Sequence, residues 1–171
     1  MTHPFLNLPP SERHLLLALS LVLTVVGIIV LGFVDPGRLS GRGPRVVGFE
    51  LAGTAMKAKR IMDNWGERGR TVAAFNLGFD YLFILGYSTL MTLVCLWASQ
   101  RHSHLLLVKL GVLLAWLQWL AGALDCVENA SLLTMLFSGP SDSVARIARV
   151  SALGKFGLLA VGLTYIITAL F

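Results

Sequence analysis

Four long apolar stretches, separated by short polar segments, leave this chain few ways to fold. They cover residues 14–34, 70–98, 104–137 and 144–171. A helix needs about 20 apolar residues to cross a hydrocarbon core of about 30 Å, and each stretch is long enough. Charged residues make up only 13% of the chain, well below the share that is usual in soluble domains. We therefore predict one all-α integral membrane domain, residues 1–171, built as a bundle of four transmembrane helices.

The connection between the first two apolar stretches is polar and has an amphipathic second half. Within residues 46–66 apolar residues recur at helical spacing, and the charged residues lie largely on other faces. The residues of this apolar face are Leu51, Ala55, Ala58, Met62 and Trp65. We predict an amphipathic helix that lies on the cytoplasmic membrane surface or caps the bundle.

Basic residues are distributed very unevenly between the two ends of the predicted bundle. The connection between the first and second stretches holds eight Lys/Arg residues, and Arg146 and Arg149 lie at the same end. The opposite end holds Arg13 and Arg101. Lys and Arg accumulate in cytoplasmic loops, so we predict that the connection is cytoplasmic and that both termini lie outside. The predicted location is a cell membrane, taken as the bacterial inner membrane because the chain is compact and its loops are basic.

Carboxylates interrupt the second and third apolar stretches at matching depths. Asp80 lies 18 residues before Ala98, about 27 Å along a helix, and Asp125 lies 20 residues after Leu105, about 30 Å. The turn between these stretches is short, so the two helices are expected to form an antiparallel hairpin. Both carboxylates should then lie at nearly the same depth, toward the cytoplasmic end.

The polar residues of each stretch also share one helix face. Asn76, Asp80 and Tyr87 are spaced i, i+4 and i+11, and a seven-residue step returns a helix to within about 20° of its starting direction. The third stretch carries a matching set, which consists of Gln118, Asp125, Glu128 and Asn129. Carboxylates that face lipid cost roughly a few kcal/mol each, so we expect both faces to point inward and toward one another.

This polar cluster is the predicted functional site. Carboxylates brought together in a low dielectric can exchange protons, bind a cation or hold a polar head group. We assign acid–base chemistry to Asp80, Asp125 and Glu128. Contacts with a ligand are assigned to Asn76, Tyr87, Gln118, Asn129, Arg146 and Arg149. The two arginines enter the fourth stretch from the same end as Lys155, and all three are expected partners of the carboxylates.

The predicted function is to bind an amphiphilic or lipid-like ligand between the second and third helices, or to act on it by acid–base chemistry. Three alternatives stay open. The cluster could be a structural network in a membrane assembly subunit, because polar contacts between helices routinely hold membrane bundles together. The chain could also be a proton- or cation-coupled carrier, or a glutathione-using membrane enzyme. The predicted partners are membrane lipid and either a second copy of the chain or another membrane protein.

The segment AFNLGFD, residues 74–80, resembles one of the two aspartate motifs of the lipoprotein signal peptidases, which also have four spans. In those enzymes the aspartate follows the asparagine by three positions, whereas Asp80 follows Asn76 by four. Their second motif, Gly-Asn-x-x-Asp-Arg, does not occur in this sequence. The resemblance therefore does not extend to the paired aspartates on which that family depends.

The longer segment ERGRTVAAFNLGFD is similar to the glutathione-binding motif of the membrane-associated eicosanoid and glutathione enzymes. That family has four spans, and its motif is Glu-Arg-x-x-Arg-Ala-x-x-Asn-x-x-Glu. The residues that match by type are Glu67, Arg68, Arg70, Asn76 and Asp80. The register slips by two positions before Asn76 and by one more before Asp80. Membership would imply a trimer with glutathione bound between its subunits.

No motif in the sequence assigns a metal or a cofactor. The four histidines lie at or beyond the ends of the apolar stretches, and Cys95 and Cys126 lie in different stretches with no CxxC pair. A di-iron bundle site needs two Glu-x-x-His pairs, whereas the third stretch offers only Asp125-x-x-Glu128. The net charge of +5 is expected to serve orientation and contact with anionic lipid, because no nucleic-acid recognition motif accompanies it.

Overall fold

The computed structural model describes residues 3–170 as an all-helical chain. A short 3₁₀ helix, η1 (Pro4–Asn7), precedes the α-helices, and this described part contains no β-strand. The α-helices are α1 (Pro10–Phe33), α2 (Pro36–Ser40), α3 (Val46–Glu50), α4 (Ala55–Ser99), α5 (Leu105–Ser138) and α6 (Asp142–Thr168). Among them α1, α4, α5 and α6 are long and apolar enough to cross a membrane. The predicted all-helical fold with four helices of this kind is confirmed.

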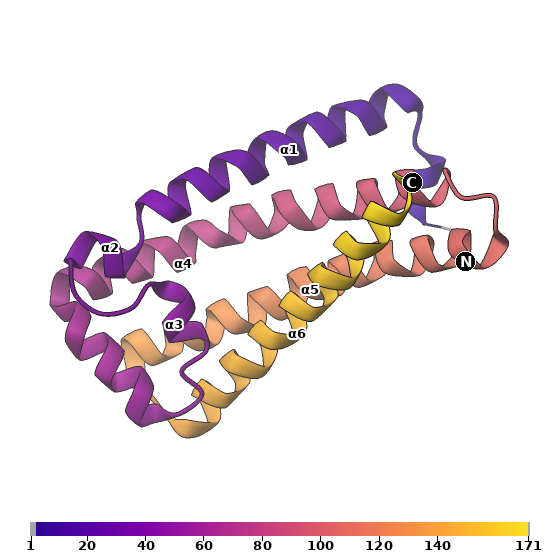
Figure 1. Cartoon of the computed structure of the whole chain (residues 1–171). Helices are drawn as coiled ribbons and strands as arrows, with labels where there is room; N and C mark the ends of the chain where they lie inside the picture. Colours follow the sequence, from indigo (N-terminus) through magenta and orange to yellow (C-terminus); the bar gives the residue numbers. More distant parts are fainter. Residues whose placement is uncertain (1–2, 171) are drawn as a thin grey trace.

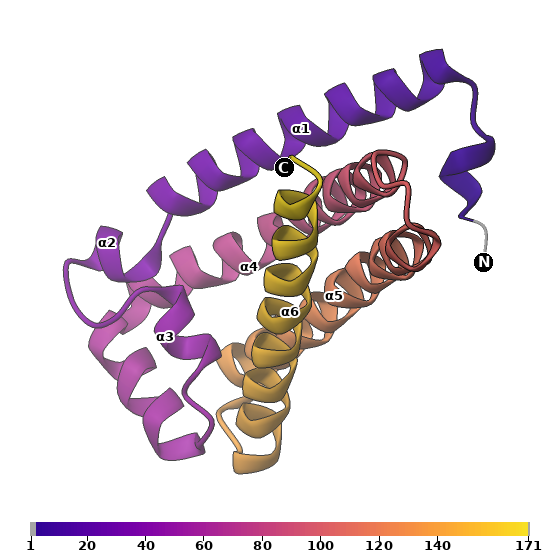
Figure 2. The same cartoon turned by 45° about the vertical axis from the view of Figure 1, so that its right-hand side comes forward.

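Helix α4 lies between α1 and the pair formed by α5 and α6 (Figure 1). α4 and α5 form an antiparallel hairpin, α5 packs on α6, and α1 packs mainly on α4. The two ends of the chain lie toward one end of the molecule, and α2 and α3 lie at the other (Figure 1). Figure 2 shows α3 between α2 and α6. Because α3 contacts α4, α5 and α6, it covers the region where these three long helices meet.

Helix α4 is bent sharply at Gly66. This residue has φ 64° and ψ −168°, outside the helical region and in a part of conformational space that favours glycine. The bend separates a first arm, residues 55–65, from a long second arm that runs beside α1 and α5 (Figure 1). Thr54 caps the first arm, since its side chain accepts a hydrogen bond from the Lys57 amide.

Residues 46–66 do not form the single amphipathic helix that the sequence pattern predicts. The chain breaks after α3, and Gly53 takes a positive φ of 68° in the turn before the first arm of α4. Ala58 and Trp65 are buried, as the pattern predicts, but Leu51 lies at the break and is exposed. The break lets α3 fold back over the bundle, which one straight helix could not do.

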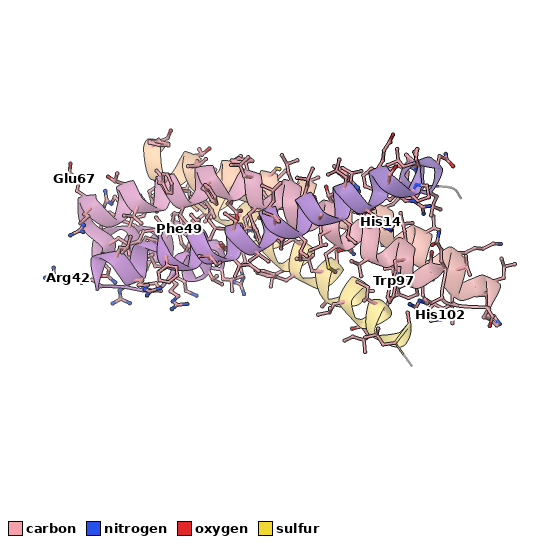
Figure 3. The ribbon with its side chains drawn as sticks, turned by 90° about the horizontal axis from the view of Figure 1, so that it is seen from above. His14, Arg42, Phe49, Glu67, Trp97 and His102 are labelled. Atoms are coloured by element: carbon pink, nitrogen blue, oxygen red, sulfur yellow. The ribbon has the colours of Figure 1, made fainter. Side chains whose placement is uncertain are left out.

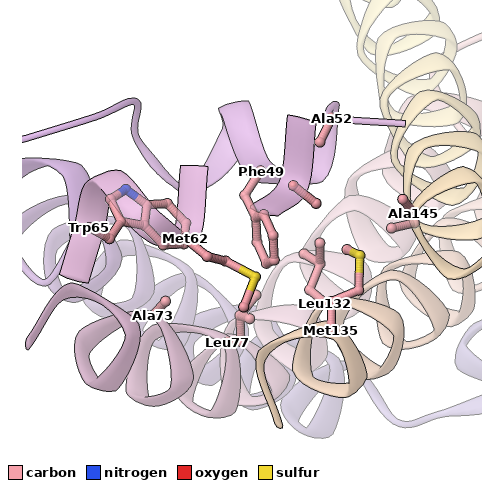
Figure 4. Packing of buried hydrophobic residues seen from close by; sticks show 11 residues of the cluster. Phe49, Ala52, Met62, Trp65, Ala73, Leu77, Leu132, Met135 and Ala145 are labelled. Carbon is pink, nitrogen blue, oxygen red and sulfur yellow. The ribbon is translucent and has the colours of Figure 1, made fainter. Parts of the chain in front are cut away.

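Phe49 anchors α3 to the bundle. Its side chain is fully buried and lies among Met62, Trp65 and Leu132, which come from α4 and α5 (Figure 4). The Phe49 and Trp65 rings meet edge to face, with their centroids 5.2 Å apart. Full burial of a side chain of this size contributes roughly 1.5–3 kcal/mol. The next residue is Glu50, so apolar packing determines where the Glu50 carboxylate lies.

The segment before α3 is held by Asp35 at the end of α1. One Asp35 oxygen accepts from the Arg38 amide at 3.0 Å and so caps α2, and the other accepts from the Val46 amide at 3.1 Å. Trp65 Nε1 donates to the Pro44 carbonyl at 2.8 Å. These hydrogen bonds hold α2, α3 and the first arm of α4 together as one unit.

Two residues of α4 bring α1 close to it. A Cβ on Gly86 would lie 2.9 Å from the Cβ of Leu23, so this approach requires glycine. Nearer to α2, Asn76 Nδ2 donates to the carbonyl groups of Leu31 and Val34 at 3.2 and 2.7 Å. Asn76 therefore satisfies carbonyl groups that the end of α1 would otherwise leave unpaired.

Charged side chains lie mostly toward the ends of the molecule, and the long helices are apolar on the outside along their middle. Figure 3 shows nitrogen-bearing side chains around Arg42, at the end that holds α2 and α3. The outer surface of α1 exposes aliphatic side chains such as Leu19, Val22 and Ile29. Large exposed apolar surfaces mark contact with a membrane or a partner. Together with the four long helices, this surface suggests a multi-pass membrane protein.

Candidate functional site

Asp125 on α5 joins three helices. Only 3% of the residue is exposed, and both carboxylate oxygens are occupied. Tyr87 Oη on α4 donates to Oδ2 at 2.8 Å, and Lys155 Nζ on α6 donates to Oδ1 at 2.6 Å. Charge-assisted hydrogen bonds are strong in a low dielectric, so these two contacts hold α4, α5 and α6 in register.

Glu128, about one turn farther along α5, shares the ammonium group of Lys155. Its side chain is fully buried, and its Oε2 lies 2.8 Å from Lys155 Nζ. The other oxygen of Glu128, Oε1, has no hydrogen-bond partner within residues 3–170. One lysine therefore serves two buried carboxylates.

Asp80 and Asn129 form a second polar bridge between α4 and α5. Asn129 Nδ2 donates to Asp80 Oδ2 at 2.7 Å. Asn129 is buried, whereas Asp80 is only partly buried. With the bond between Tyr87 and Asp125, this bridge shows that the polar faces of the two helices meet at the same level, as their spacing predicts.

Glu50 on α3 is a fourth carboxylate, and helical spacing placed it on a polar surface rather than in the site. Only 8% of the residue is exposed, and its Oε2 has no hydrogen-bond partner in the described part of the chain. Burial raises the pKa of Glu50 above its usual range, against the opposing effect of the Lys155 charge. The signal that could have found it is its position as the one charged residue of the apolar run VVGFELAG.

Two of the predicted ligand-binding amides bond to backbone carbonyl groups. Asn76 serves the end of α1, although it also lines the cavity beside the cluster. Gln118 Nε2 donates to the Leu114 and Leu158 carbonyls, both at 3.3 Å, and so ties α5 to α6. Gln118 shares a helix face with Asp125 but lies about two turns away from it, so it is not part of the carboxylate cluster.

Arg146 and Arg149 are not the partners of the carboxylates that the sequence analysis expects. Both are exposed, and within residues 3–170 neither forms an ion pair. The Arg149 side chain lies instead beside Gly53, in the turn between α3 and α4. Lys155 is the partner because it lies six residues beyond Arg149, about 9 Å farther along α6, at the level of Asp125.

A cavity of about 450 Å³ opens beside this cluster, and we call it the groove. Residues of α4 from Asn76 to Met91 line the groove, which corresponds to about 22 Å of helix. α1 and α6 contribute further wall residues, and α3 lies at one end. The lining near α3 combines aliphatic side chains, among them Val46 and Val47, with the polar residues Glu50, Asp80, Asp125, Asn129 and Lys155. The lining far from α3 consists of Thr24, Leu90, Met91 and Leu159. The charged side chains are thus confined to one end of the groove.

A second cavity, of about 370 Å³, lies at the opposite end of the molecule, between η1 and the outer turns of α1 and α4. Its lining is mainly apolar, and the basic residues that reach it, Arg13 and His14, are not fully buried. Its lining contains no carboxylate. In residues 3–170 no group of three His, Cys, Asp or Glu side chains is arranged to hold a metal ion. The groove is therefore the candidate site.

The residues that resemble the glutathione-binding motif are not gathered around one cavity, because Asn76 and Asp80 line the groove whereas Glu67 and Arg70 line a separate cavity of about 540 Å³. Glu67 and Arg68 are exposed next to the bend at Gly66, and Arg70 forms an ion pair with Asp63 at 2.8 Å. Comparison with protein-family models, with curated proteins and with solved structures finds no match for this chain. Function is therefore argued from the contents of the groove.

Proposed function

We propose that this protein binds an amphiphile in the groove, with its head group beside Glu50 and Asp80 and its tail along α4. The change of lining along one cavity carries this proposal. Buried carboxylates, an amide and an ammonium group lie at one end, and aliphatic side chains lie at the other. Ligand sites combine apolar walls with a few placed polar groups, and a lipid-like molecule has one part for each end of the groove.

The walls of the groove also offer a path for such a ligand. α1 packs mainly on α4, whereas α6 packs on α5 and α4, so α1 and α6 flank the groove without forming a continuous seal. In a bilayer, acyl chains would surround the outer faces of both helices. We propose that the ligand enters sideways from the membrane, between α1 and α6, without crossing a layer of water.

The unpaired oxygens favour a ligand site over a purely structural network. A structural network would pair its members, as Asp125 and Asn129 are paired. Glu50 instead keeps a buried oxygen, Oε2, that accepts from no donor in the described residues. Such groups are rare, and each costs about 1–3 kcal/mol unless a partner arrives. A bound head group that donates hydrogen bonds could supply a partner for Glu50, which lines the groove.

We assign acid–base chemistry to the carboxylates that line the groove and have an oxygen without a donor. Glu50 and Asp80 meet this description. Asp125 has both oxygens occupied, so we propose that it positions Tyr87 and Lys155. The predicted acid–base role of Asp125 is thereby replaced by a positioning role, and Glu50 joins Asp80 as the group that can exchange a proton with the head group.

Blocking the aliphatic end of the groove tests the proposal. Leu90 lines that end, and Leu90→Trp should fill it without touching the charged end. Leu85→Trp is the matched control, because Leu85 lies on the same helix and is 56% exposed. Native mass spectrometry of gently solubilised protein should find a bound amphiphile on the wild type and on Leu85→Trp, and loss of most of it from Leu90→Trp. Equal binding to all three proteins would overturn the proposal.

We also propose that the end holding α2 and α3 faces the cytoplasm of a bacterial cell. Eight Lys/Arg residues of the first connection support this orientation, together with Arg146 and Arg149. A membrane-impermeant maleimide added to intact cells should label a cysteine introduced by Ser103→Cys and leave one introduced by Arg42→Cys unlabelled. Both positions are exposed, so the opposite labelling pattern would reverse the orientation.

A further inference from the structure

We infer that the groove selects an amphiphile with a primary ammonium head group, received between the carboxylates of Glu50 and Asp80. This inference rests on the proposed function, because it names the head group of the molecule held in the same groove. The two carboxylates come from different elements, α3 and α4, and both line the charged end of the groove. Glu50 is more than nine-tenths buried and presents an oxygen with no partner among the described residues.

Carboxyl groups outnumber ammonium groups at this end of the groove. Four carboxylates gather there, and Lys155 is in ion-pair contact with two of them, Asp125 and Glu128. Within residues 3–170 neither Glu50 nor Asp80 forms an ion pair. A cationic head group would supply the missing positive charge, and an anionic one would add to the excess.

The other charged residues of the lining do not remove this excess. Arg45 lines the groove from the segment before α3, but its side chain is exposed and pairs with no carboxylate of the described chain. Asp35 also lines the groove, and its two oxygens accept from the Arg38 and Val46 amides. The negative charge that a ligand meets therefore comes from Glu50 and Asp80.

The carboxylate oxygens of Glu50 and Asp80 that could bond to a ligand are hydrogen-bond acceptors. Asn129 occupies Oδ2 of Asp80, which leaves Oδ1 for a ligand, and Oε2 of Glu50 accepts from no donor in the described residues. A primary ammonium group carries three N–H donors, enough to donate to both carboxylates. A quaternary ammonium carries the charge but no donor, and an alcohol carries one donor but no charge. Of these three head groups, only the primary ammonium meets both requirements, and it has the most N–H donors of any ammonium group.

Four amphiphiles with the same alkyl chain test the inference: dodecylamine, dodecyltrimethylammonium, dodecanol and dodecyl sulfate. Each is offered at neutral pH to the protein in nanodiscs of uncharged lipid, and binding is followed by competition in native mass spectrometry. We expect dodecylamine to bind the wild type about tenfold to a hundredfold more tightly than the other three, because its charge-assisted hydrogen bonds are the strongest available. Leu90→Trp should reduce binding of all four.

Variants of Glu50 and Asp80 show whether these two carboxylates cause the preference for dodecylamine. Glu50→Gln and Asp80→Asn should each remove most of the preference for dodecylamine, whereas Glu67→Gln, on the exposed surface, should keep it. Asp80→Asn retains a side-chain oxygen for Asn129, so it provides the test if Glu50→Gln does not fold. Preference for dodecylamine that survives in both carboxylate variants would overturn the inference.

The outcome also separates this inference from the proposed function. Tight binding of dodecanol or dodecyl sulfate in the groove, equal to that of dodecylamine and sensitive to Leu90→Trp, would overturn the ammonium inference and leave the amphiphile site standing. If Leu90→Trp leaves the binding of all four compounds unchanged, both the ammonium inference and the proposed amphiphile site are overturned.

Discussion

Replacement of Lys155 by methionine is expected to lower the free energy of unfolding by about 3–5 kcal/mol. Lys155 Nζ lies 2.6 Å from Asp125 Oδ1 and 2.8 Å from Glu128 Oε2, and all three side chains are buried. Removal of the ammonium group leaves two carboxylates in the interior with no compensating charge. Reversible unfolding in mixed micelles of a mild and a denaturing detergent measures the loss.

Two further variants show whether the unpaired buried carboxylates cause the loss of stability in Lys155→Met. Lys59→Met breaks the exposed pair between Lys59 and Asp63, and it should leave the unfolding curve almost unchanged, since exposed pairs contribute little. Lys155→Met combined with Asp125→Asn and Glu128→Gln should recover much of the lost stability, because no buried charge is then unpaired. If Lys155→Met alone unfolds like the wild type, the carboxylates are neutral and the ion pairs do not hold α6 to α5.

Replacement of Glu50 by glutamine is expected to raise the free energy of unfolding of the ligand-free protein at neutral pH by about 1–3 kcal/mol. The Glu50 carboxylate is buried, its Oε2 accepts from no donor in the described residues, and it lies close to the negative charge of Asp125. Glutamine has nearly the same shape, carries no charge and brings an N–H donor into a cluster of acceptors. A group kept for ligand binding rather than for stability is expected to behave in this way.

The same variant should flatten the dependence of stability on pH. Burial raises the pKa of Glu50, so the folded protein holds a proton at pH values where the unfolded chain has lost it. Stability therefore falls as pH rises from the unfolded pKa to the raised folded pKa, and then levels off. The charged groups that act on Glu50 are Lys155 on α6, Asp125 on α5 and Asp35 after α1, and Glu128 on α5 faces Glu50 at hydrogen-bonding range. Glu50→Gln removes the contribution of Glu50 to this slope.

Unfolding curves of the wild type, Glu50→Gln and the exposed control Glu67→Gln, recorded across the acidic to neutral range, measure both effects. The control should reproduce the wild-type profile. A Glu50→Gln protein that is less stable than the wild type at neutral pH would show that the carboxylate has a structural partner. That result would favour a structural network over a ligand site.

Helical spacing was sufficient to predict that the polar faces of α4 and α5 meet. The turn between these helices is short, so distance along each helix translates directly into depth. Asp80 and Asp125 could therefore be matched by counting residues, and the bonds of Tyr87 to Asp125 and of Asn129 to Asp80 lie where this count puts them. The rise and period of a helix determine this match, and neither depends on the rest of the fold.

The choice of partners within the site could not be predicted in the same way. Arg146, Arg149 and Lys155 all lie on α6, and the position of α6 against α5 decides which of them reaches Asp125. Asn76 and Gln118 lie on the polar faces, but carbonyl groups of α1 and of α6 accept their hydrogen bonds. The position of a residue on a helix face gives the direction of its side chain. Its hydrogen-bond partner depends on how the neighbouring helices pack against that face.

On its own, the sequence specifies four long apolar helices with carboxylates facing inward on two of them, because length, polarity and periodicity are local properties. Only the tertiary structure brings Glu50 into the site. That step requires a break after α3, with Gly53 at positive φ, and the burial of Phe49 among residues of α4 and α5. Leu132 lies more than eighty positions from Phe49, so no local pattern could encode this contact or place the Glu50 carboxylate beside the groove.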